Sequence, residues 1–304
     1  MWNTSNNTFK PSFSQNNMLV RLLYANIAVF LAIKLLALPF WLFQTQLSAD
    51  QFALNWFAVP SDLTKLLFKP WTLLSYMFLH LGFFHIFFNM LGLYFLGQLF
   101  VQLLGEKKLW TLYISGGIAG AILYIIFFNV FPVFESITPF SKMLGASASV
   151  FAIVSAVGTY APDLPVRMIF LGNIKLKYIA GTFILISFLN ISKANPGGNI
   201  AHIGGALLGF FFARKWRKGK DITAWVNTAT AFVKAIFTFK KKSRMKVKYK
   251  KSNQQQRSES RYEYNSRKKE EQEQVDAILD KISRSGYDSL TKAEKDFLFR
   301  ASGK

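Results

Sequence analysis

Serine and histidine side chains suited to nucleophilic catalysis lie at the edges of apolar runs in this chain. The segment 145–149 (GASAS) contains only small residues and stands at the head of an apolar run. The chain has three histidines, His80, His85 and His202, and all three flank apolar runs. A serine hydroxyl becomes a good nucleophile when a base removes its proton, and imidazole suits that role because it titrates near neutral pH. These residue types indicate serine-based chemistry inside a membrane.

Helix geometry brings the candidate groups to a similar depth in the bilayer. An α-helix rises about 1.5 Å per residue, and the hydrocarbon core is roughly 30 Å thick. Counted from the inner ends of their spans, Ser147 lies at roughly 20 Å, Asn89 at roughly 22 Å and His202 at roughly 17 Å. His85 is one turn above Asn89 on the same helix face. Polar side chains at that depth are costly, and they face a bundle interior or a water-filled cavity.

Each of these groups also has a purely structural interpretation. Ser147 can pack between helices, because small hydroxyl residues fit there. His202 can hydrogen-bond to a neighbouring helix, and His85 with Asn89 can cap a helix or fix a loop. The coincidence of depth and residue type favours catalysis over these alternatives.

The pattern indicates a Ser–His dyad in preference to a triad or a metal site. No Asp or Glu lies in any predicted span, so a carboxylate partner for the histidine is not available. Depth slightly favours His202 over His85 as the base, and His80 is expected in a loop. For the oxyanion, Asn89 offers an amide, His85 an N–H and Ser147 its backbone N–H at a helix start. The chain lacks His-Glu-x-x-His, cysteine and a membrane aspartate pair, so we expect no metal and no other cofactor.

Composition divides the chain into an apolar part and a basic part. Of its 304 residues, 51% are hydrophobic, and the few acidic residues before Asp221 lie between the apolar runs. After Asp221 the chain becomes polar and strongly basic, and the net charge is +21. Next to a membrane domain, such a charge favours membrane orientation and anionic lipid over nucleic acid. We therefore expect a membrane domain followed by a cytosolic tail.

Apolar runs predict an all-α membrane domain with six transmembrane helices, at about 18–43, 84–104, 109–133, 143–161, 178–191 and 200–213. A polar N-terminus, 1–17, precedes them, and the semi-apolar segment 44–84 is expected to lie in the membrane interface. The basic residues after the sixth run place both termini in the cytosol. Gly205 and Gly209, four residues apart in that run, allow close packing between membrane helices.

Three segments resemble the rhomboid family of intramembrane serine proteases in their order and spacing. They are 80–89 (HLGFFHIFFN), 145–148 (GASA) and 201–209 (AHIGGALLG). The resemblance covers 18–218 and implies a six-helix rhomboid protease domain of the bacterial type, in the bacterial inner membrane. It implies Ser147 as the nucleophile and His202 as its general base.

The resemblance also implies supporting roles. His85, Asn89 and the Ser147 amide would form the oxyanion hole, and Gly145 would keep the turn before the serine tight. His80 matches a position that is structural more than chemical. Two positions depart from the family pattern. Thr72 follows Trp71 where many members have arginine, so the first loop would be anchored differently. Phe151 stands where some members have the tyrosine that stacks under the base, and phenylalanine can still stack.

The resulting expectation is a serine endopeptidase that cuts transmembrane helices with locally unstable, small-residue stretches. A helical peptide bond is protected by its own hydrogen bonds, so the substrate must unwind to reach the serine. The alternative is a catalytically silent, rhomboid-like binder of membrane helices, although both dyad residues are present. A transporter or channel is disfavoured because neither an ionisable relay nor inverted repeats are visible. The sequence leaves the substrate and the oligomeric state open.

The basic tail divides into three further segments. In 219–251, apolar residues recur at helical spacing between Ile222 and Phe239, which favours an interfacial amphipathic helix over a seventh span. Its polybasic end, 240–251, suits anionic lipid on the cytosolic leaflet. The segment 252–274 is polar and is expected to be a disordered linker.

The last segment, 275–304, is predicted to be a small helical hairpin. Val275, Ile278, Leu279 and Ile282 form one helical face, and Ser285-Gly286 interrupts it. Thr291 with Glu294 fits a capping box at the start of a second helix. The hairpin resembles tails of some bacterial rhomboids and suggests an adaptor for a cytosolic partner, but the resemblance implies no activity.

Overall fold

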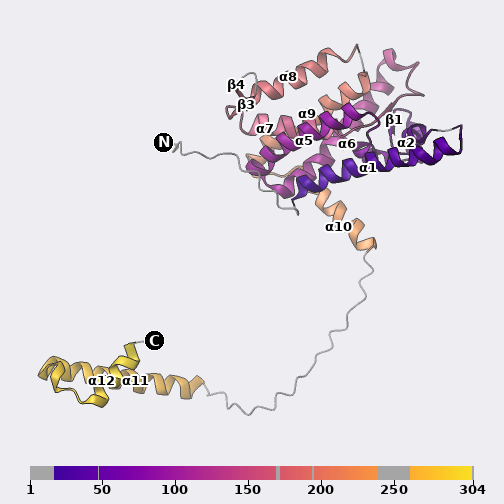
Figure 1. Ribbon diagram of the computed structural model, residues 1–304. Coiled ribbons are helices and arrows are strands. Elements are labelled where there is room, and N and C mark those ends of the chain that lie inside the picture. The colour runs from indigo at the N-terminus through magenta and orange to yellow at the C-terminus, as the bar shows by residue number, and fades with distance from the viewer. Residues whose placement is uncertain (1–16, 47, 169–171, 194, 238–260, 303–304) are drawn as a thin grey trace. The chain divides into compact units, whose positions relative to one another are not determined.

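The computed structural model describes residues 17–46, 48–168, 172–193, 195–237 and 261–302, which are mostly helical (Figure 1). The chain divides into two compact units, 1–239 and 240–304. The apolar helices and every candidate site residue belong to the first unit.

Helices form at all the predicted spans: α1 (Met18–Leu42), α5 (Phe83–Leu104), α6 (Glu106–Val130), α7 (Ser147–Tyr160), α8 (Leu176–Leu189) and α9 (Pro196–Trp216). Within the described residues, α1, α5 and α6 are long and apolar enough to cross a membrane, and α7 and α8 are shorter apolar helices. Figure 1 shows α7 and α9 among the other helices of this unit. Most side chains of α7 are buried, so this helix forms the centre of the core.

Small residues bring the backbones of α7 and α9 together. A Cβ atom on Gly205 would lie 2.0 Å from the carbonyl oxygen of Ala148, and one on Gly209 would lie 2.1 Å from that of Ala152. Neither position can hold a side chain without moving a helix. The Gly-x-x-x-Gly spacing on α9 thus holds the two site-bearing helices at a fixed separation.

The fourth helix starts later than the predicted span 143–161. Gly145 has a φ of 116°, which is outside the helical region, and Met143 belongs to a strand. Helix α7 therefore begins at Ser147 itself, and the chain before it forms a turn.

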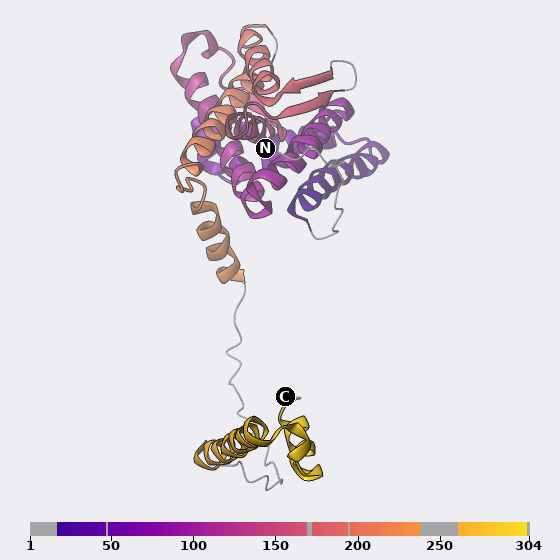
Figure 2. The same ribbon diagram turned by 90° about the vertical axis from the view of Figure 1, so that its left-hand side faces the viewer.

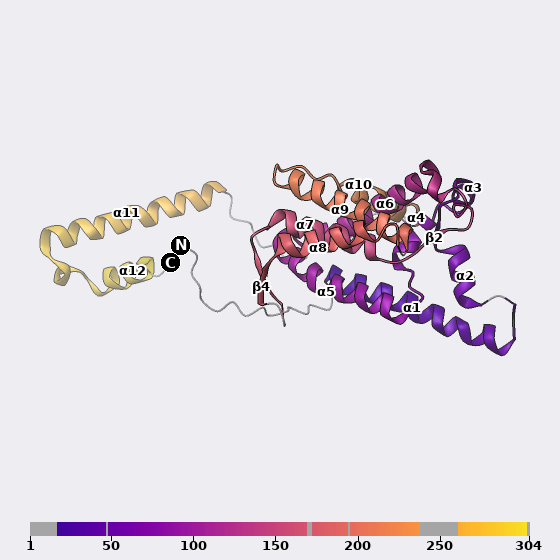
Figure 3. The same cartoon turned by 90° about the horizontal axis from the view of Figure 1, so that it is seen from above.

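The segment predicted as an interfacial loop is folded. It contains α2 (Ala49–Trp56), β1 (Val59–Pro60), α3 (Leu63–Phe68), α4 (Thr72–Ser75) and the short 3-10 helix η1 (Tyr76–Phe78), which lie near one end of the unit in Figure 3. A second 3-10 turn, η2 (Pro132–Phe134), follows α6.

The fold is mostly helical, and two small antiparallel sheets add to what the sequence predicts. Strand β1 pairs with β2 (Lys142–Met143), with Val59 opposite Met143. Strand β3 (Pro165–Met168) pairs with β4 (Gly172–Lys175), and Figure 2 shows this hairpin beside the helices. The strands are two to four residues long, so they leave no period in the sequence. They satisfy backbone groups that lie outside the helices.

After α9 the chain returns to the base of α6. Lys108 in the first turn of α6 forms an ion pair with Asp221, and the hydroxyls of Thr111 and Thr223 lie 2.8 Å apart. Helix α10 (Trp225–Phe237) starts from this anchor. Trp225, Phe232 and Val233 expose their side chains, as the amphipathic pattern predicts. Residues 238–251, which include the polybasic end, lie outside the described residues.

The second unit consists of α11 (Arg261–Ser285), η3 (Tyr287–Ser289) and α12 (Lys292–Ser302). The predicted helix break is confirmed, because α11 ends at Ser285 and Gly286 has a φ of 79°. The capping box is also confirmed: the Glu294 carboxylate accepts from the Thr291 amide at 2.7 Å, and the Thr291 hydroxyl accepts from the Glu294 amide at 3.4 Å.

The prediction of a disordered linker over 252–274 is wrong from residue 261 onward, where α11 already runs. Its polar residues are strong helix formers, and pairs such as Lys269–Glu273 lie four apart and support the helix. Low hydrophobicity was therefore a poor guide to order here. Residues 252–260 lie outside the described residues.

Candidate active site

The structure brings Ser147 and His202 together. Ser147 is the first residue of α7, and its Oγ lies 2.7 Å from Nε2 of His202 on α9. Both side chains are half-buried. The two helices that carry them are those held together by Gly205 and Gly209. A serine hydroxyl hydrogen-bonded to an imidazole is the arrangement that activates a serine nucleophile.

Phe151 supports the imidazole from one side. It follows Ser147 by one helical turn, and its ring lies face to face with the His202 ring, at 4.2 Å between centroids and 9° between planes. The Phe151 ring also contacts the ring of Phe183 on α8 edge-on, at 6.1 Å between centroids. This stacking restricts rotation of the imidazole. A phenylalanine ring is enough for it, so the hydroxyl of a tyrosine at this position is not required.

A residue that sequence reasoning missed contacts the other imidazole nitrogen. Ser187 on α8 has its Oγ 3.1 Å from Nδ1 of His202. The sequence signal was a single serine within the apolar run 176–189, which alone says nothing about its partner.

The turn before Ser147 is built on glycine. A Cβ atom on Gly145 would lie 2.6 Å from Nε2 of His85, so only glycine lets that imidazole approach the turn. The Gly145 amide donates to the carbonyl of Tyr76 at 2.8 Å. His80 is fully buried, accepts a hydrogen bond from the Ala146 amide at 3.3 Å, and lies edge to face with His85 at 5.0 Å. The two histidines thus fix the backbone that leads into Ser147.

His85, Asn89 and Ser147 line one cavity of about 620 Å³, together with His202. One amide N–H of Asn89 donates to the backbone carbonyl of His85 at 2.8 Å. An amide group has two such hydrogens, so the other is free to face the cavity. Ser147 occupies the first helical position, where a backbone N–H has no partner within the helix. The remaining lining residues are Leu81, Phe84, Phe88, Lys142, Met143, Leu144, Asn195 and Gly198.

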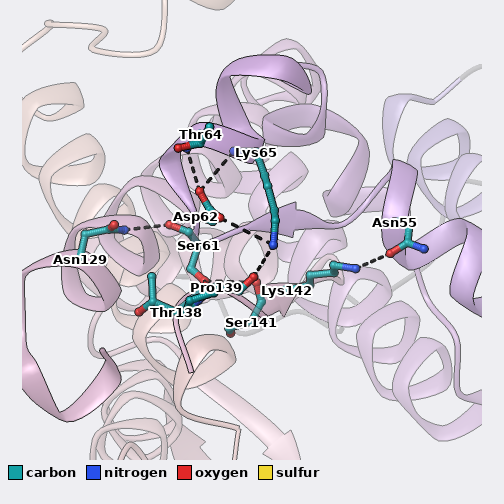
Figure 4. A network of polar contacts seen from close by, with 10 residues as sticks. All are labelled: Asn55, Ser61, Asp62, Thr64, Lys65, Asn129, Thr138, Pro139, Ser141 and Lys142. Carbon is teal, nitrogen blue, oxygen red and sulfur yellow. Dashed lines mark hydrogen bonds and ion pairs between the residues drawn. The ribbon is translucent and has the colours of Figure 1, made fainter. Parts of the chain in front are cut away.

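Lys142 brings a positive charge to this lining. Its ammonium donates to Asn55, and burial together with the nearby charges of Lys69 and Lys65 lowers its pKa. Figure 4 shows the polar network at this rim, in which Lys65 reaches the carbonyl of Pro139. These contacts connect the segment before β2 to the first loop.

Around this network, Ser61 connects the same two loops at their base. Its hydroxyl donates to the carbonyl of Thr138 at 2.7 Å, and its own carbonyl accepts from the Asn129 amide at 2.8 Å (Figure 4). These hydrogen bonds from side chains to backbone carbonyls connect the first loop to the segment before β2 and to the end of α6.

The first loop is anchored around Trp71. The Trp71 indole donates to the carbonyl of Trp56 at 2.8 Å, and the two indoles stack at 6.4 Å. The Lys69 ammonium lies 4.7 Å from the centre of the Trp56 ring. Thr72 is fully buried, and its hydroxyl donates to the Lys69 carbonyl at 2.6 Å.

Comparison with known proteins agrees with this geometry. Residues 68–218 match the Rhomboid domain family, and residues 262–304 match a family of unknown function (DUF6576). The chain is 31% identical over 146 residues to rhomboid protease GluP of Bacillus subtilis, covering 47% of this chain and 25% of that protein. It is 33% identical over 142 residues to RHOMBOID-like protein 2 of Arabidopsis thaliana, covering 47% of this chain and 41% of that protein. The chain therefore belongs to the rhomboid family of membrane proteins.

The matches cover less than half of each of these relatives. A further relative, 32% identical over 82 residues, is named Inactive RHOMBOID-like protein 8 of Arabidopsis thaliana, and the match covers 27% of this chain and 23% of that protein. Family membership alone therefore supports either a protease or a rhomboid-like protein without activity. The geometry of the candidate active site is the evidence that distinguishes these two alternatives.

Proposed function

We propose that this protein is an intramembrane serine endopeptidase that cuts transmembrane helices of other membrane proteins. The observation that carries the proposal is the 2.7 Å contact between Ser147 Oγ and His202 Nε2 at the wall of a cavity of about 620 Å³. A protein that had lost activity would have no need to keep this pair, the stacked Phe151 and the glycine turn together.

In the proposed reaction, Ser147 Oγ attacks the substrate carbonyl carbon while His202 Nε2 accepts the hydroxyl proton. The tetrahedral intermediate carries its negative oxygen toward the Ser147 amide, the free Asn89 N–H and the His85 imidazole. His202 then returns the proton to the leaving amine, and the peptide bond breaks. A water molecule, deprotonated by the same imidazole, hydrolyses the acyl-serine ester.

The proposed membrane arrangement follows from the helices and the basic residues. The helices α1, α5, α6, α7, α8 and α9 would together span the bilayer of a bacterial inner membrane, with both termini in the cytosol. Arg214 and Lys215 lie in the last turn of α9, at the end that would face the cytosol. Helix α10 and the polybasic segment after it would contact anionic lipid, and the hairpin of the second unit would bind a cytosolic partner.

The first experiment measures cleavage of a model transmembrane substrate in liposomes by the full chain. We expect Ser147→Ala and His202→Ala to abolish cleavage while thermal unfolding stays unchanged. Ser115→Ala is the matched control, because Ser115 is a buried serine of α6 whose hydroxyl has no hydrogen-bond partner among the described residues. It should cut at the wild-type rate.

The outcome also separates the alternatives. Cleavage that survives Ser147→Ala but not Ser149→Ala would move the nucleophile by two residues, although Ser149 is fully buried and does not line the cavity. A wild-type protein that binds unstable transmembrane helices and cuts none would establish the catalytically silent binder instead.

A further inference from the structure

Ser187 has unusual surroundings for a serine in an apolar helix. Helix α8 exposes most of its side chains and buries only Leu176, Ala180 and Ser187. Two of these three are apolar, as expected for a helix that packs against α7 and α9. Ser187 is 4% exposed, and the partner of its hydroxyl is Nδ1 of His202. A buried hydroxyl costs free energy unless it is hydrogen-bonded, so this contact accounts for its place in the helix.

The contact between Ser187 Oγ and His202 Nδ1 determines which nitrogen of the imidazole carries the proton. A neutral imidazole carries its proton on one nitrogen and accepts with the other. For Nε2 to accept the proton of Ser147, Nδ1 must hold the ring proton. Ser187 Oγ, 3.1 Å away, then accepts a hydrogen bond from Nδ1–H. The hydrogen bond on one ring nitrogen selects the tautomer that leaves the other nitrogen available.

We propose that Ser187 is a positioning residue that completes a Ser147–His202–Ser187 relay across α7, α9 and α8. The proposal rests on the function proposed above. In the relay, Ser187 takes the place that a carboxylate holds in a Ser-His-Asp triad: it fixes the tautomer and orientation of the base. The serine is neutral, so it orients the imidazolium that forms but does not neutralise its charge.

Because serine is neutral and a triad carboxylate is charged, removal of the Ser187 hydroxyl should lower the rate less than removal of a carboxylate does. A net hydrogen bond between neutral groups is worth about 1 kcal/mol, which corresponds to a rate change of about fivefold. The loss of a triad carboxylate costs far more, about 10⁴-fold. Removal of the Ser187 hydroxyl should therefore slow the chemical step without abolishing it, and substrate binding should stay unchanged because Ser187 does not line the cavity.

The test compares Ser187→Ala, Ser187→Thr and the control Ser115→Ala in the full chain in liposomes, with the same transmembrane substrate. We expect Ser187→Ala to lower kcat about fivefold with KM unchanged. Ser187→Thr, which keeps the hydroxyl, should recover most of the rate, and Ser115→Ala should match the wild type. If Ser187→Ala and Ser115→Ala have the same kcat, the positioning role is wrong.

A second measurement does not depend on cleavage. The nitrogen chemical shifts of His202 distinguish the Nδ1–H from the Nε2–H tautomer in histidine-labelled protein. We expect the Nδ1–H tautomer to dominate in the wild type and in Ser147→Ala, and the other tautomer to become populated in Ser187→Ala. An unchanged tautomer in Ser187→Ala would overturn the proposal even if kcat fell. A wild type without cleavage activity would refute the proposed function but would leave this spectroscopic result valid.

Discussion

The imidazole of His202 is held by two neighbouring helices that pack in different ways. Helix α9 lies with its glycines against carbonyl oxygens of α7, backbone to backbone. Helix α8 packs through a few side chains and exposes Phe183, Leu185, Ile186 and Phe188. The 2.7 Å contact between His202 and Ser147 therefore depends on rigid backbone packing, whereas the 3.1 Å contact to Ser187 depends on a more loosely held helix. Changes at the first interface should cost much more activity than changes at the second.

The largest effect is expected from Gly205→Ala. The new Cβ would meet the Ala148 carbonyl at 2.0 Å, so α9 must move away from α7 and carry His202 from Ser147. A displacement of about 1 Å in a catalytic group can cost about 10²-fold in rate. We expect at least that loss in the liposome cleavage assay.

Gly181→Ala on α8 is the matched control for this substitution. A Cβ atom there meets nothing within 4 Å, and alanine favours a helix over glycine by about 1 kcal/mol. Activity should persist and the unfolding temperature should rise slightly. If Gly181→Ala and Gly205→Ala lose the same activity, the loss comes from reduced backbone flexibility and not from the close packing of α9 against α7. The proposed difference between the two interfaces would then be wrong.

Gly158→Ala tests the second interface and should have a smaller effect. Its Cβ would meet the Cβ of Ala180 at 2.6 Å, so α8 would be pushed from α7. We expect kcat to fall by up to about fivefold through the loss of the Ser187 hydrogen bond. In the Ser187→Ala background the same substitution should have little further effect, because both act on one contact. If the losses in kcat from Gly158→Ala and Ser187→Ala are instead additive, the packing of α8 against α7 does not act through the hydrogen bond between Ser187 and His202.

Phe151→Ala removes the stack from the face of the base and should lower kcat about fivefold, since stacked aromatic pairs contribute about 0.5–1.5 kcal/mol. Phe151→Tyr keeps the stacked ring and should keep the rate. The two variants are compared by kcat in the same assay. A wild-type rate in Phe151→Ala would mean that the α7–α9 packing alone orients His202.

The smallest effect is expected at the ion pairs between the end of α7 and the start of α8. Asp163 accepts from Lys177 at 2.9 Å and Lys175 at 3.2 Å, and these hydrogen bonds lower the pKa of Asp163 below its usual value of 3.8. The same contact with Asp163 raises the pKa of Lys177 above 10.5. Exposed pairs of this kind contribute little, so Asp163→Asn should change kcat less than about twofold.

The pH dependence of that small contribution has a defined sign. Because the folded pKa of Asp163 is depressed, its contribution is complete above pH 3.8 and is lost as pH falls through the folded value. Because the folded pKa of Lys177 is raised, its contribution is complete below pH 10.5 and is lost above it. The difference in unfolding temperature between wild type and Asp163→Asn should therefore be flat near neutral pH and vanish in acid. If the difference in unfolding temperature grows in acid, a titrating group other than Asp163 causes it.

The sequence predicts those candidate site residues whose type is rare in a membrane span. Ser147, His202, His85 and Asn89 were found because histidines and a small-residue turn stand out against apolar runs. Ser187 was missed because one serine in an apolar helix is ordinary, and its partner is decided only by how α8 lies against α9. Residue type thus reveals a group that is costly to bury, but not the tertiary contact of a small group that is easily buried.

In the fold, too, elements with a local sequence signal could be predicted, whereas elements that depend on distant contacts could not. Long apolar runs located the helices to within a few residues, because hydrophobicity is sustained over the whole element. The strands β1 and β2 depend on a pairing between Val59 and Met143, which lie far apart in sequence, and no local signal can contain it. Helix α11 was missed for the opposite reason, because charge was given more weight than helix propensity.

The stacking of Phe151 on His202 also gives the molecule a built-in magnetic marker. An aromatic ring shields protons above its face, so the carbon-bound protons of the His202 imidazole should resonate upfield of those of an unstacked imidazole. With three histidines in the chain, selective labelling yields a spectrum simple enough to assign by substitution, and Phe151→Leu should return the shifted signal downfield. The position of the base could then be followed in lipid, substrate or inhibitor titrations in which no bond is cut.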